Sequence, residues 1–359
     1  MVYKVIGLMS GSSLDGLDIV FTELHENSGS WSFEILEAEC YAYTKEWSDK
    51  LANAVNLSAL DYQLLHAEYG AYLGDEVNRF IEEKGLQYKV ALVASHGHTT
   101  FHVPSKRMTA QLGDGAALAA RTKGIVVSDL RALDIAFGGQ GAPIVPIGEK
   151  LLLKEYSVFL NIGGIANLSV HTPGSSIAFD VCAANKILNL LMNKVGKEYD
   201  AGGQLAQTGR INNDLLQQLN SLKYYSEPYP KSLANSFGID EVFPIVESYG
   251  LTVADALRTY VEHIALQIKN SLEHSVGGIE NPKLLVAGGG AFNTFLIERL
   301  TQALLPLNIE VVVPGDKIIQ YKEALVMALI GVLRWRQEYN VLSSVTGAEQ
   351  DSIGGAVWT

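Results

Sequence analysis

The sequence has little cysteine, a deficit of basic charge and no long apolar run. Its two cysteines, Cys40 and Cys182, are too few for a disulfide framework or a cysteine-based zinc site, so we expect free thiols. The 27 Lys and Arg residues are outnumbered by 39 Asp and Glu, and the net charge of −12 argues against a nucleic-acid partner. The longest apolar stretch, residues 324–333, has ten residues where a membrane-spanning helix needs about 20, and the N-terminus lacks a signal-peptide layout. These absences predict a cytoplasmic protein without a membrane partner.

The remaining composition is that of an ordinary folded protein. Of 359 residues, 48% are hydrophobic and 18% are charged, with 34 Gly and 10 Pro, which excludes disordered, collagen-like and coiled-coil chains. The length is sufficient for two domains.

Apolar alternation and periodicity predict two copies of one α/β pattern. Each copy opens with a strand, a turn rich in Gly or Ser, and two more strands, and the two copies start about 150 residues apart. The predicted strands are 3–9, 19–24, 31–43, 89–97, 124–130, the two runs of 158–170, 175–181, 283–290 and 309–314. The predicted helices are 57–84, 113–123, 146–155, 184–196, 210–222, 253–274, 294–304 and 321–338.

This order of elements predicts an α/β fold of two duplicated lobes with mixed sheets. We place the lobes at residues 1–135 and 136–359, with a hinge at 131–145, and the last helix can pack back on the first lobe.

A tight turn of small residues follows the first predicted strand. Its backbone N–H groups and hydroxyls could cradle phosphate, although Gly, Ser and Asp are also the usual residues of a plain hairpin loop. The glycine spacing resembles a P-loop, but Leu17 and Asp18 stand where Lys and Ser or Thr are required. Two carboxylates in such a turn suit a magnesium ion. The segment consists of Gly11, Ser12, Ser13, Leu14, Asp15, Gly16, Leu17 and Asp18.

Two further glycine clusters lie in the second half. The turn at 161–167 offers Asn161, Gly163, Gly164 and Asn167, and a third cluster follows an apolar strand at Gly288, Gly289 and Gly290. Asn293 stands where a dinucleotide-binding fingerprint needs a small residue, which argues against a Rossmann site. Three such clusters in a duplicated α/β chain favour a nucleotide-dependent phosphotransferase.

Several polar residues are candidates for catalysis or substrate binding. Asp180 ends a predicted strand before a helix, where a carboxylate is either catalytic or a helix cap. His96, His98 and His102 are spaced like metal ligands but lack a nearby carboxylate, so His96 is more simply a hydrogen-bonding group in a cleft. Candidate cleft residues also include Arg131 and Glu323.

Taken together, the motifs resemble the anhydro-N-acetylmuramic acid kinase family. The resemblance covers almost the whole chain and rests on GSSLDGLD, SHGHTTFH, GGQGAPIVP, LNIGGIANLSV, YPKS, LLVAGGGAFN, KEALVMA and SVTGAEQDSIGGAVW, in that order. That family belongs with the sugar kinases, actin and the heat-shock ATPases. The resemblance therefore implies two actin-like or sugar-kinase-like lobes that close on ATP.

The resemblance also implies a reaction and a set of roles. ATP would phosphorylate O6 of 1,6-anhydro-N-acetylmuramic acid while water opens the anhydro bridge at C1, giving N-acetylmuramic acid 6-phosphate in cell-wall recycling. Asp180 would be the general base, and the sugar would meet His96, Arg131 and Glu323. ATP would be held by residues 11–18, Asn161, Gly163, Gly164, Gly288, Gly289, Gly290 and Asn293, with Mg²⁺ at Asp15 and Asp18.

The chain departs from the family pattern at three places. After Asp180 the usual Thr-Gly-Pro-Gly-Asn is Val181-Cys182-Ala183-Ala184-Asn185, and after Ser232 the usual Thr-Gly-Arg-Glu is residues 233–236. His98 replaces a usual Gln. A kinase of a related anhydro sugar, an ATPase without a sugar substrate, and a glycosidase that uses Asp180 and Glu323 are therefore the alternatives, and a homodimer is left open.

Overall fold

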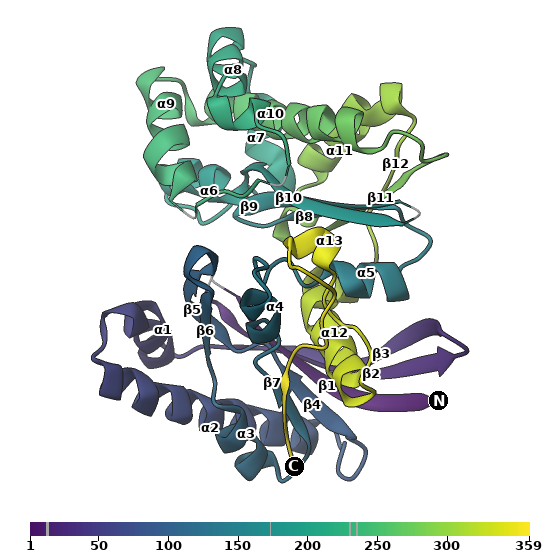
Figure 1. Cartoon of the computed structure of the whole chain (residues 1–359). Helices are drawn as coiled ribbons and strands as arrows, with labels where there is room; N and C mark the ends of the chain where they lie inside the picture. The colour runs from purple at the N-terminus through teal and green to yellow at the C-terminus, as the bar shows by residue number, and fades with distance from the viewer. Residues whose placement is uncertain (12–13, 173, 230, 235) are drawn as a thin grey trace. The chain divides into compact units, whose positions relative to one another are not determined.

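The computed structural model describes residues 1–11, 14–172, 174–229, 231–234 and 236–359 (Figure 1). Ser12 and Ser13 of the predicted phosphate turn lie outside the described residues. The chain divides into two compact units, a first unit of Met1–Lys154 with Tyr321–Thr359 and a second unit of Glu155–Gln320. The first unit thus extends to Lys154, beyond the expected boundary at residue 135, and includes the end of the chain.

The first unit is built on a six-stranded mixed sheet. The predicted antiparallel meander is formed by β1 (Val2–Ser10), β2 (Gly16–Asn27) and β3 (Ser30–Ala42). On the other side of β1, β4 (Leu92–Ser95) and β7 (Val126–Ser128) are parallel to it, and β13 (Ala356–Trp358) closes the edge antiparallel to β7. The strand order is β13-β7-β4-β1-β2-β3.

Helices cover both faces of this sheet. On one face, α2 (Ala59–Glu83) buries Leu73, Val77 and Phe80, and α3 (Gly115–Thr122) packs against α2. On the other face, α12 (Asp316–Trp335) lies so close to the strands that a Cβ at Gly7 would be 2.0 Å from the Ala324 carbonyl oxygen. Glycine is therefore required where β1 meets α12, and this contact explains why the late helix joins the first unit from Tyr321 onward.

The extension of the first unit to Lys154 also has a physical cause. Helix α5 (Pro146–Leu152) packs on β3, and Glu149 of α5 pairs with Lys322 of α12 at 2.7 Å. Both side chains are buried, so the two helices are tied together inside the first unit.

The second unit repeats the arrangement with a five-stranded sheet. β8 (Val158–Ile162), β9 (Ile165–Thr172) and β10 (Ser175–Ala183) form the antiparallel meander. β11 (Lys283–Ala287) is parallel to β8, and β12 (Glu310–Val312) is parallel to β11. The order β10-β9-β8-β11-β12 corresponds strand for strand to β3-β2-β1-β4-β7 of the first unit. The predicted duplication of an α/β unit with a mixed sheet is therefore confirmed.

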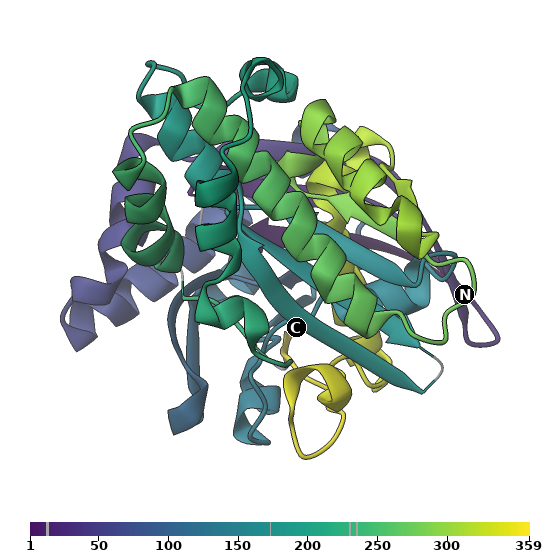
Figure 2. The same ribbon diagram turned by 90° about the horizontal axis from the view of Figure 1, so that it is seen from above.

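The core of the second unit lies between its sheet and a layer of helices. α10 (Val253–Ser275) carries the predicted apolar stripe, and Figure 2 shows it beside α11 (Thr294–Leu304) over the strands. The other helices of this unit are α6 (Asn185–Asn193), α7 (Gln204–Thr208), α8 (Asn213–Asn220) and α9 (Phe243–Ser248).

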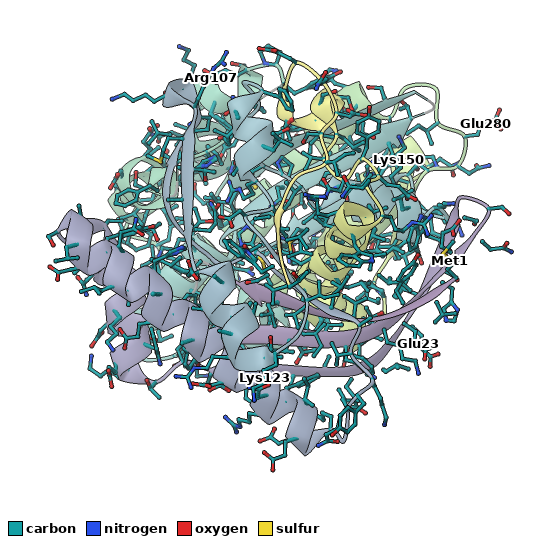
Figure 3. The ribbon with its side chains drawn as sticks, turned by 60° about the horizontal axis from the view of Figure 1, so that its bottom comes forward. Met1, Glu23, Arg107, Lys123, Lys150 and Glu280 are labelled. Carbon is teal, nitrogen blue, oxygen red and sulfur yellow. The ribbon has the colours of Figure 1, made fainter. Side chains whose placement is uncertain are left out.

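Some elements of the first unit lie outside the predicted pattern. They are α1 (Lys45–Asn53), the hairpin β5 (His98–Val103) and β6 (Met108–Leu112), α4 (Ala132–Ala136) and α13 (Ser343–Thr346). In Figure 3 the labelled Arg107, Lys123 and Glu280 point away from the ribbon. Within the described ranges, each helix is too short or too polar to cross a bilayer.

Candidate active site

The predicted phosphate turn joins β1 to β2 in the first unit. Of its described residues, Leu14 has a φ of 59°, a left-handed conformation that a residue with a branched side chain adopts only when its surroundings impose it. Gly16 is required by packing, because a Cβ there would lie 2.7 Å from both Cys40 Sγ and the Tyr41 carbonyl oxygen. Leu17 is buried in the core of the unit. The turn is therefore constrained at its β2 end by the neighbouring strand β3.

Asp18 lies in an acidic environment two residues beyond the turn. It is directly opposite Cys40 in the β2–β3 pairing. Burial raises the pKa of Asp18 to about 6, the hydrogen bond from Cys40 opposes that rise, and the Asp15 and Glu323 carboxylates add to it. The sequence predicted Asp15 and Asp18 together, and the structure adds Glu323 of α12 to the charges that act on Asp18.

Glu323 is partly buried on α12, next to the Glu149–Lys322 pair. Burial raises its pKa, the Lys322 ammonium lowers it and the Glu149 carboxylate raises it. The carboxyl group of Glu323 is therefore within the electrostatic influence of both partners of the pair. Sequence analysis selected Glu323 but gave no signal for Glu149, which lies far from it along the chain.

His96 and Arg131 follow the adjacent parallel strands β4 and β7, whose carboxyl ends lie at the same edge of the sheet. His96 is buried and donates or accepts a 2.9 Å hydrogen bond with the Gly97 carbonyl oxygen through Nδ1, which makes Nδ1 the donor. Burial and the positive charge of Arg131 lower the pKa of His96 to about 4. His96 is therefore a neutral hydrogen-bonding group near pH 7.

Arg131 is a buried cation held by uncharged acceptors. Nε donates to the Gly141 carbonyl oxygen at 2.6 Å, and Nη1 donates to Thr99 Oγ1 at 2.9 Å. Nη2 lies 3.2 Å from Nδ1 of His102. Burial lowers the pKa of Arg131 to about 10, and the charge of Asp134 opposes that shift. Among the described residues no carboxylate forms an ion pair with Arg131, so its guanidinium group can accept an anionic ligand.

Asp134 fixes the backbone that holds Arg131. Its side chain is fully buried and accepts hydrogen bonds from the Gly141 N–H and the Thr346 hydroxyl, both at 2.7 Å. Gly141 is thus bound through its N–H to Asp134 and through its carbonyl to Arg131. The predicted hinge segment 131–145 contains this network.

The glycines of the second unit fall into two groups. A Cβ at Gly288 would lie 2.5 Å from Asn161 Oδ1, and one at Gly290 would lie 2.2 Å from Ile162 Cγ2, so packing within the unit requires both glycines. By contrast, a Cβ at Gly163, Gly164 or Gly289 would meet no atom closer than 3.6 Å. The absence of a side chain at these three positions leaves backbone open to a ligand.

Asn161 and Asp180 belong to one row of polar residues across the second sheet. Asn161 of β8 is opposite Asn167 of β9, and Asn167 is opposite Asp180 of β10. Directly opposed residues point to the same face, and these three are partly exposed while the alternate residues form the core. The expected position of Asp180 at the strand end is wrong by three residues, because β10 continues through a bulge between Asp180 and Cys182 to Ala183.

A segment distant in sequence surrounds the Asp180 carboxylate. The Leu233 N–H donates to Asp180 Oδ2 at 2.8 Å, and the Asp180 N–H donates to the Lys231 carbonyl oxygen at 3.2 Å. The Tyr224 hydroxyl donates to the Asp180 carbonyl oxygen at 2.7 Å. Burial raises the pKa of Asp180, and the hydrogen bond from Leu233 opposes the rise. Sequence analysis noted the unusual run after Ser232 but did not place it against Asp180.

Asn293 and the remaining histidines have structural partners. Asn293 caps α11 by accepting a 3.0 Å hydrogen bond from the Leu296 N–H. His98 Nδ1 bonds to Ser10 Oγ, and His102 contacts Arg131 and Thr109, so the three histidines do not converge. The part of the chain that the structure describes contains no group of three His, Cys, Asp or Glu side chains able to hold a metal ion.

Two α/β units of the same topology, each with a polar turn at the first hairpin, define the class of protein. The profile of the anhydro-N-acetylmuramic acid kinase family matches residues 3–359. The chain therefore belongs to the anhydro-N-acetylmuramic acid kinase family, a family of ATP-dependent sugar kinases.

Solved structures are similar over most of the chain at low sequence identity. One is the activator of the 2-hydroxyisocaproyl-CoA dehydratase from Clostridium difficile with bound ADPNP, with 14% identity, a TM-score of 0.47, and 94% of this chain and 96% of that chain covered. Another is component A of the (R)-2-hydroxyglutaryl-CoA dehydratase of Acidaminococcus fermentans, with 15% identity, a TM-score of 0.46, and coverage of 91% and 96%. A ROK family protein from Streptococcus pneumoniae in complex with sucrose has 11% identity, a TM-score of 0.39, and coverage of 93% and 99%.

Proposed function

We propose that the protein phosphorylates O6 of 1,6-anhydro-N-acetylmuramic acid with ATP while water opens the anhydro bridge, giving N-acetylmuramic acid 6-phosphate. The observation that carries this proposal is the Asp180 carboxylate, half-buried and hydrogen-bonded by Leu233, in a chain of this family. A role in cell-wall recycling in the cytoplasm is part of the proposal.

Asp180 would act as the general base for water. Water attacks C1, its proton passes to Asp180, and the C1–O6 bond breaks with its electron pair remaining on O6. That oxygen then attacks the γ-phosphorus of ATP, and the bond from phosphorus to ADP breaks. Burial suits this role because it raises the pKa of Asp180 and makes the carboxylate a stronger base. A carboxylate beside C1 also offsets the positive charge of an oxocarbenium-like transition state.

The nucleotide phosphates would bind to backbone N–H groups in turns that carry few side chains. In the second unit, Gly163, Gly164 and Gly289 support this role because packing does not explain them. In the first unit, the turn from Gly11 to Gly16 takes the corresponding position between the first two strands of the duplicated pattern. An acidic protein can bind ATP in this way because amides and a metal, more than lysines, neutralise the phosphates.

Asp15 and Asp18 would hold the magnesium ion. Magnesium usually takes one or two protein carboxylates and completes its shell with phosphate oxygens and water. The donor set fits, because Asp18 is a partly buried carboxylate whose pKa is raised by burial and then by the negative charges of Asp15 and Glu323. The bound ion would neutralise phosphate charge during transfer.

Arg131, His96 and Glu323 would bind the sugar. The buried Arg131 guanidinium, with neutral acceptors as its printed partners, supports a substrate that carries a negative charge. The lactyl carboxylate of N-acetylmuramic acid supplies such a charge, whereas a neutral anhydro sugar does not. Neutral His96 can hydrogen-bond a hydroxyl or amide group of the sugar.

A second candidate is the same reaction on a related anhydro sugar. The observation that favours it is the hydrogen bond from Leu233 to Asp180, because Leu233 begins the run that departs from the family pattern. The sugar-facing surroundings of Asp180 are therefore particular to this chain.

Turnover of a panel of sugars tests both candidates. The purified protein is supplied with ATP, magnesium and one of three sugars: 1,6-anhydro-N-acetylmuramic acid, 1,6-anhydro-N-acetylglucosamine without the lactyl group, or N-acetylmuramic acid without the bridge. ADP release with the first alone supports the proposed reaction. Preference for the second supports the related-sugar candidate, and cleavage without ATP indicates a glycosidase.

A further inference from the structure

Four buried side chains form a continuous chain of hydrogen bonds beneath the β1–β2 turn. The Tyr43 hydroxyl lies 2.6 Å from the Tyr69 hydroxyl and donates to Ser10 Oγ at 2.8 Å. Ser10 Oγ lies 3.1 Å from Nδ1 of His98. Their exposed fractions are 0% for Tyr69, 9% for Tyr43, 4% for Ser10 and 6% for His98, so solvent does not replace these partners. The chain connects α2, the end of β3, the end of β1 and the start of β5.

The hydrogen atoms of this chain can be assigned in order. Because Tyr43 donates to Ser10, the Tyr43 oxygen accepts from Tyr69, and the single Ser10 proton is left for His98. His98 then accepts through Nδ1 and carries its proton on Nε2. Burial lowers the pKa of His98, which agrees with a neutral imidazole. Every proton in the chain has one acceptor.

The same residues constrain the turn at both of its ends. Ser10 is the last residue of β1 and is held by Tyr43 and His98. At the other end the Tyr43 N–H donates to the Asp15 carbonyl oxygen at 3.2 Å. In between, the Ser48 hydroxyl of α1 donates to the Leu14 carbonyl oxygen at 3.3 Å. These contacts explain how Leu14 is kept in its left-handed conformation, since such strain persists only where the surroundings over-determine it.

We propose that Tyr43 and His98 are positioning residues that hold the β1–β2 turn, through Ser10, in the shape that receives the nucleotide phosphates. This inference rests on the proposed nucleotide-binding role of the turn. A turn that is already ordered loses less conformational entropy on binding, so the network increases affinity for ATP without touching it. The histidine acceptor is a feature of this chain, since the family resemblance places Gln at position 98.

Direct binding of ATP to variant proteins tests the proposal. His98→Leu removes the acceptor, whereas His98→Asn keeps one, because the Asn amide oxygen can stand near the position of Nδ1. Tyr43→Phe removes one hydroxyl and keeps the ring. The control is Tyr72→Phe, because Tyr72 packs against Tyr43 with ring centroids 6.2 Å apart and has no printed hydrogen bond within the described residues. The readouts are the Kd of ATP with magnesium by calorimetry, the Tm, and kcat at saturating ATP.

We expect His98→Leu and Tyr43→Phe each to weaken ATP binding about five- to tenfold, the effect of one lost hydrogen bond in a preorganised site. His98→Asn should bind within about twofold of the wild type, and Tyr72→Phe should be unchanged. The double variant His98→Leu/Tyr43→Phe should bind no more weakly than about the worse single variant, because both act through Ser10. At saturating ATP, kcat should remain near that of the wild type.

Three results would overturn the positioning role. They are equal weakening by His98→Leu and His98→Asn, multiplied losses in the double variant, or a lower Tm with unchanged Kd, which indicates a structural network alone. Wild-type protein that does not bind ATP would remove this inference and the proposed function together. Wild-type protein that binds ATP while the variants bind equally well would remove this inference alone.

Discussion

Asn167 and Asp180 are direct partners across β9 and β10, and Asn161 of β8 continues the same row. The row places a carboxylate and two amides on the partly exposed face of a sheet whose other face is apolar core. Because Leu233 donates to one oxygen of Asp180, that oxygen is fixed and the other can face a reactant. This arrangement makes Asp180 the sharpest target for mutation.

Asp180→Asn should reduce kcat by roughly 10²–10⁴-fold, because the amide has nearly the same shape but cannot take a proton from water. The Kd of ATP should change by less than about twofold. Asp240→Asn, which neutralises an exposed carboxylate of the same unit, is the matched control. Normal turnover by the Asp180 variant would remove it from the role of base.

The position of the label in oxygen-18 water provides an independent check of that role. Water that attacks C1 should place the label on the anomeric oxygen of the product and leave the phosphate unlabelled. The product must be examined early, because anomeric exchange adds label later. Label in the phosphate would contradict the proposed attack at C1.

The pH dependence of kcat/KM should have an acid limb above the ordinary pKa of aspartate. Burial raises the pKa of Asp180, and a general base acts only when ionised, so activity should fall as pH falls through that raised value. The residual activity of Asp180→Asn should lack this limb. A limb of the same midpoint in both proteins would assign it to another group.

The glycines of the second unit should separate ligand binding from folding. Gly163→Val and Gly289→Val should weaken ATP binding at nearly unchanged Tm, because each added Cβ has room in the unit. Gly288→Ala should destabilise the protein, because its φ is +79° and the new Cβ would lie 2.5 Å from Asn161 Oδ1. Unchanged ATP affinity in both valine variants would contradict the nucleotide role of these turns.

The sequence predicted the fold well where local signals and core packing agree. Helix α2 has a serine N-cap, with Ser58 accepting from the Asp61 N–H, and an apolar stripe through Leu65 and Leu73. The hairpin of β5 and β6 was not predicted, because its strands carry mostly partly exposed residues without clear alternation. Packing that joins distant segments, such as α12 on β1, likewise has no local signature.

The candidate site was predictable residue by residue but not in its contacts. Glycine clusters and the strand-borne Asp180 stand out in the sequence, and their assignment to ATP and to catalysis stays a prediction. The partner of Asp180, Leu233, lies 53 residues away and acts through its backbone N–H, which no residue type encodes. Asn293, by contrast, has a helix cap as its structural role.

Asp18→Asn should stabilise the protein in the absence of metal and weaken magnesium-dependent activity. The pKa of Asp18 is raised from 3.8 to about 6, so the folded state binds more protons between these values and stability falls as pH rises through that window. Removing the charge should recover up to about 2 kcal/mol near pH 7. Chemical denaturation at pH 4 and 7 measures this, and equal effects at both values would contradict it.

The buried Glu149–Lys322 pair should be more important for specificity of structure than for stability itself. Lys322→Met alone leaves the buried Glu149 carboxylate without this partner and should cost about 3–5 kcal/mol, whereas Glu149→Leu/Lys322→Met should be within about 1 kcal/mol of the wild type or more stable. Denaturant titrations of the single and double variants measure the difference.

The same variants report on Glu323. Lys322 lowers the pKa of Glu323 and Glu149 raises it, so Lys322→Met should raise that pKa and the double variant should largely cancel the change. If ionised Glu323 binds the sugar, the KM for sugar of Lys322→Met should rise as pH is lowered, at a higher pH than in the wild type, while the double variant follows the wild type. Matching pH profiles for all three proteins would separate Glu323 from the pair.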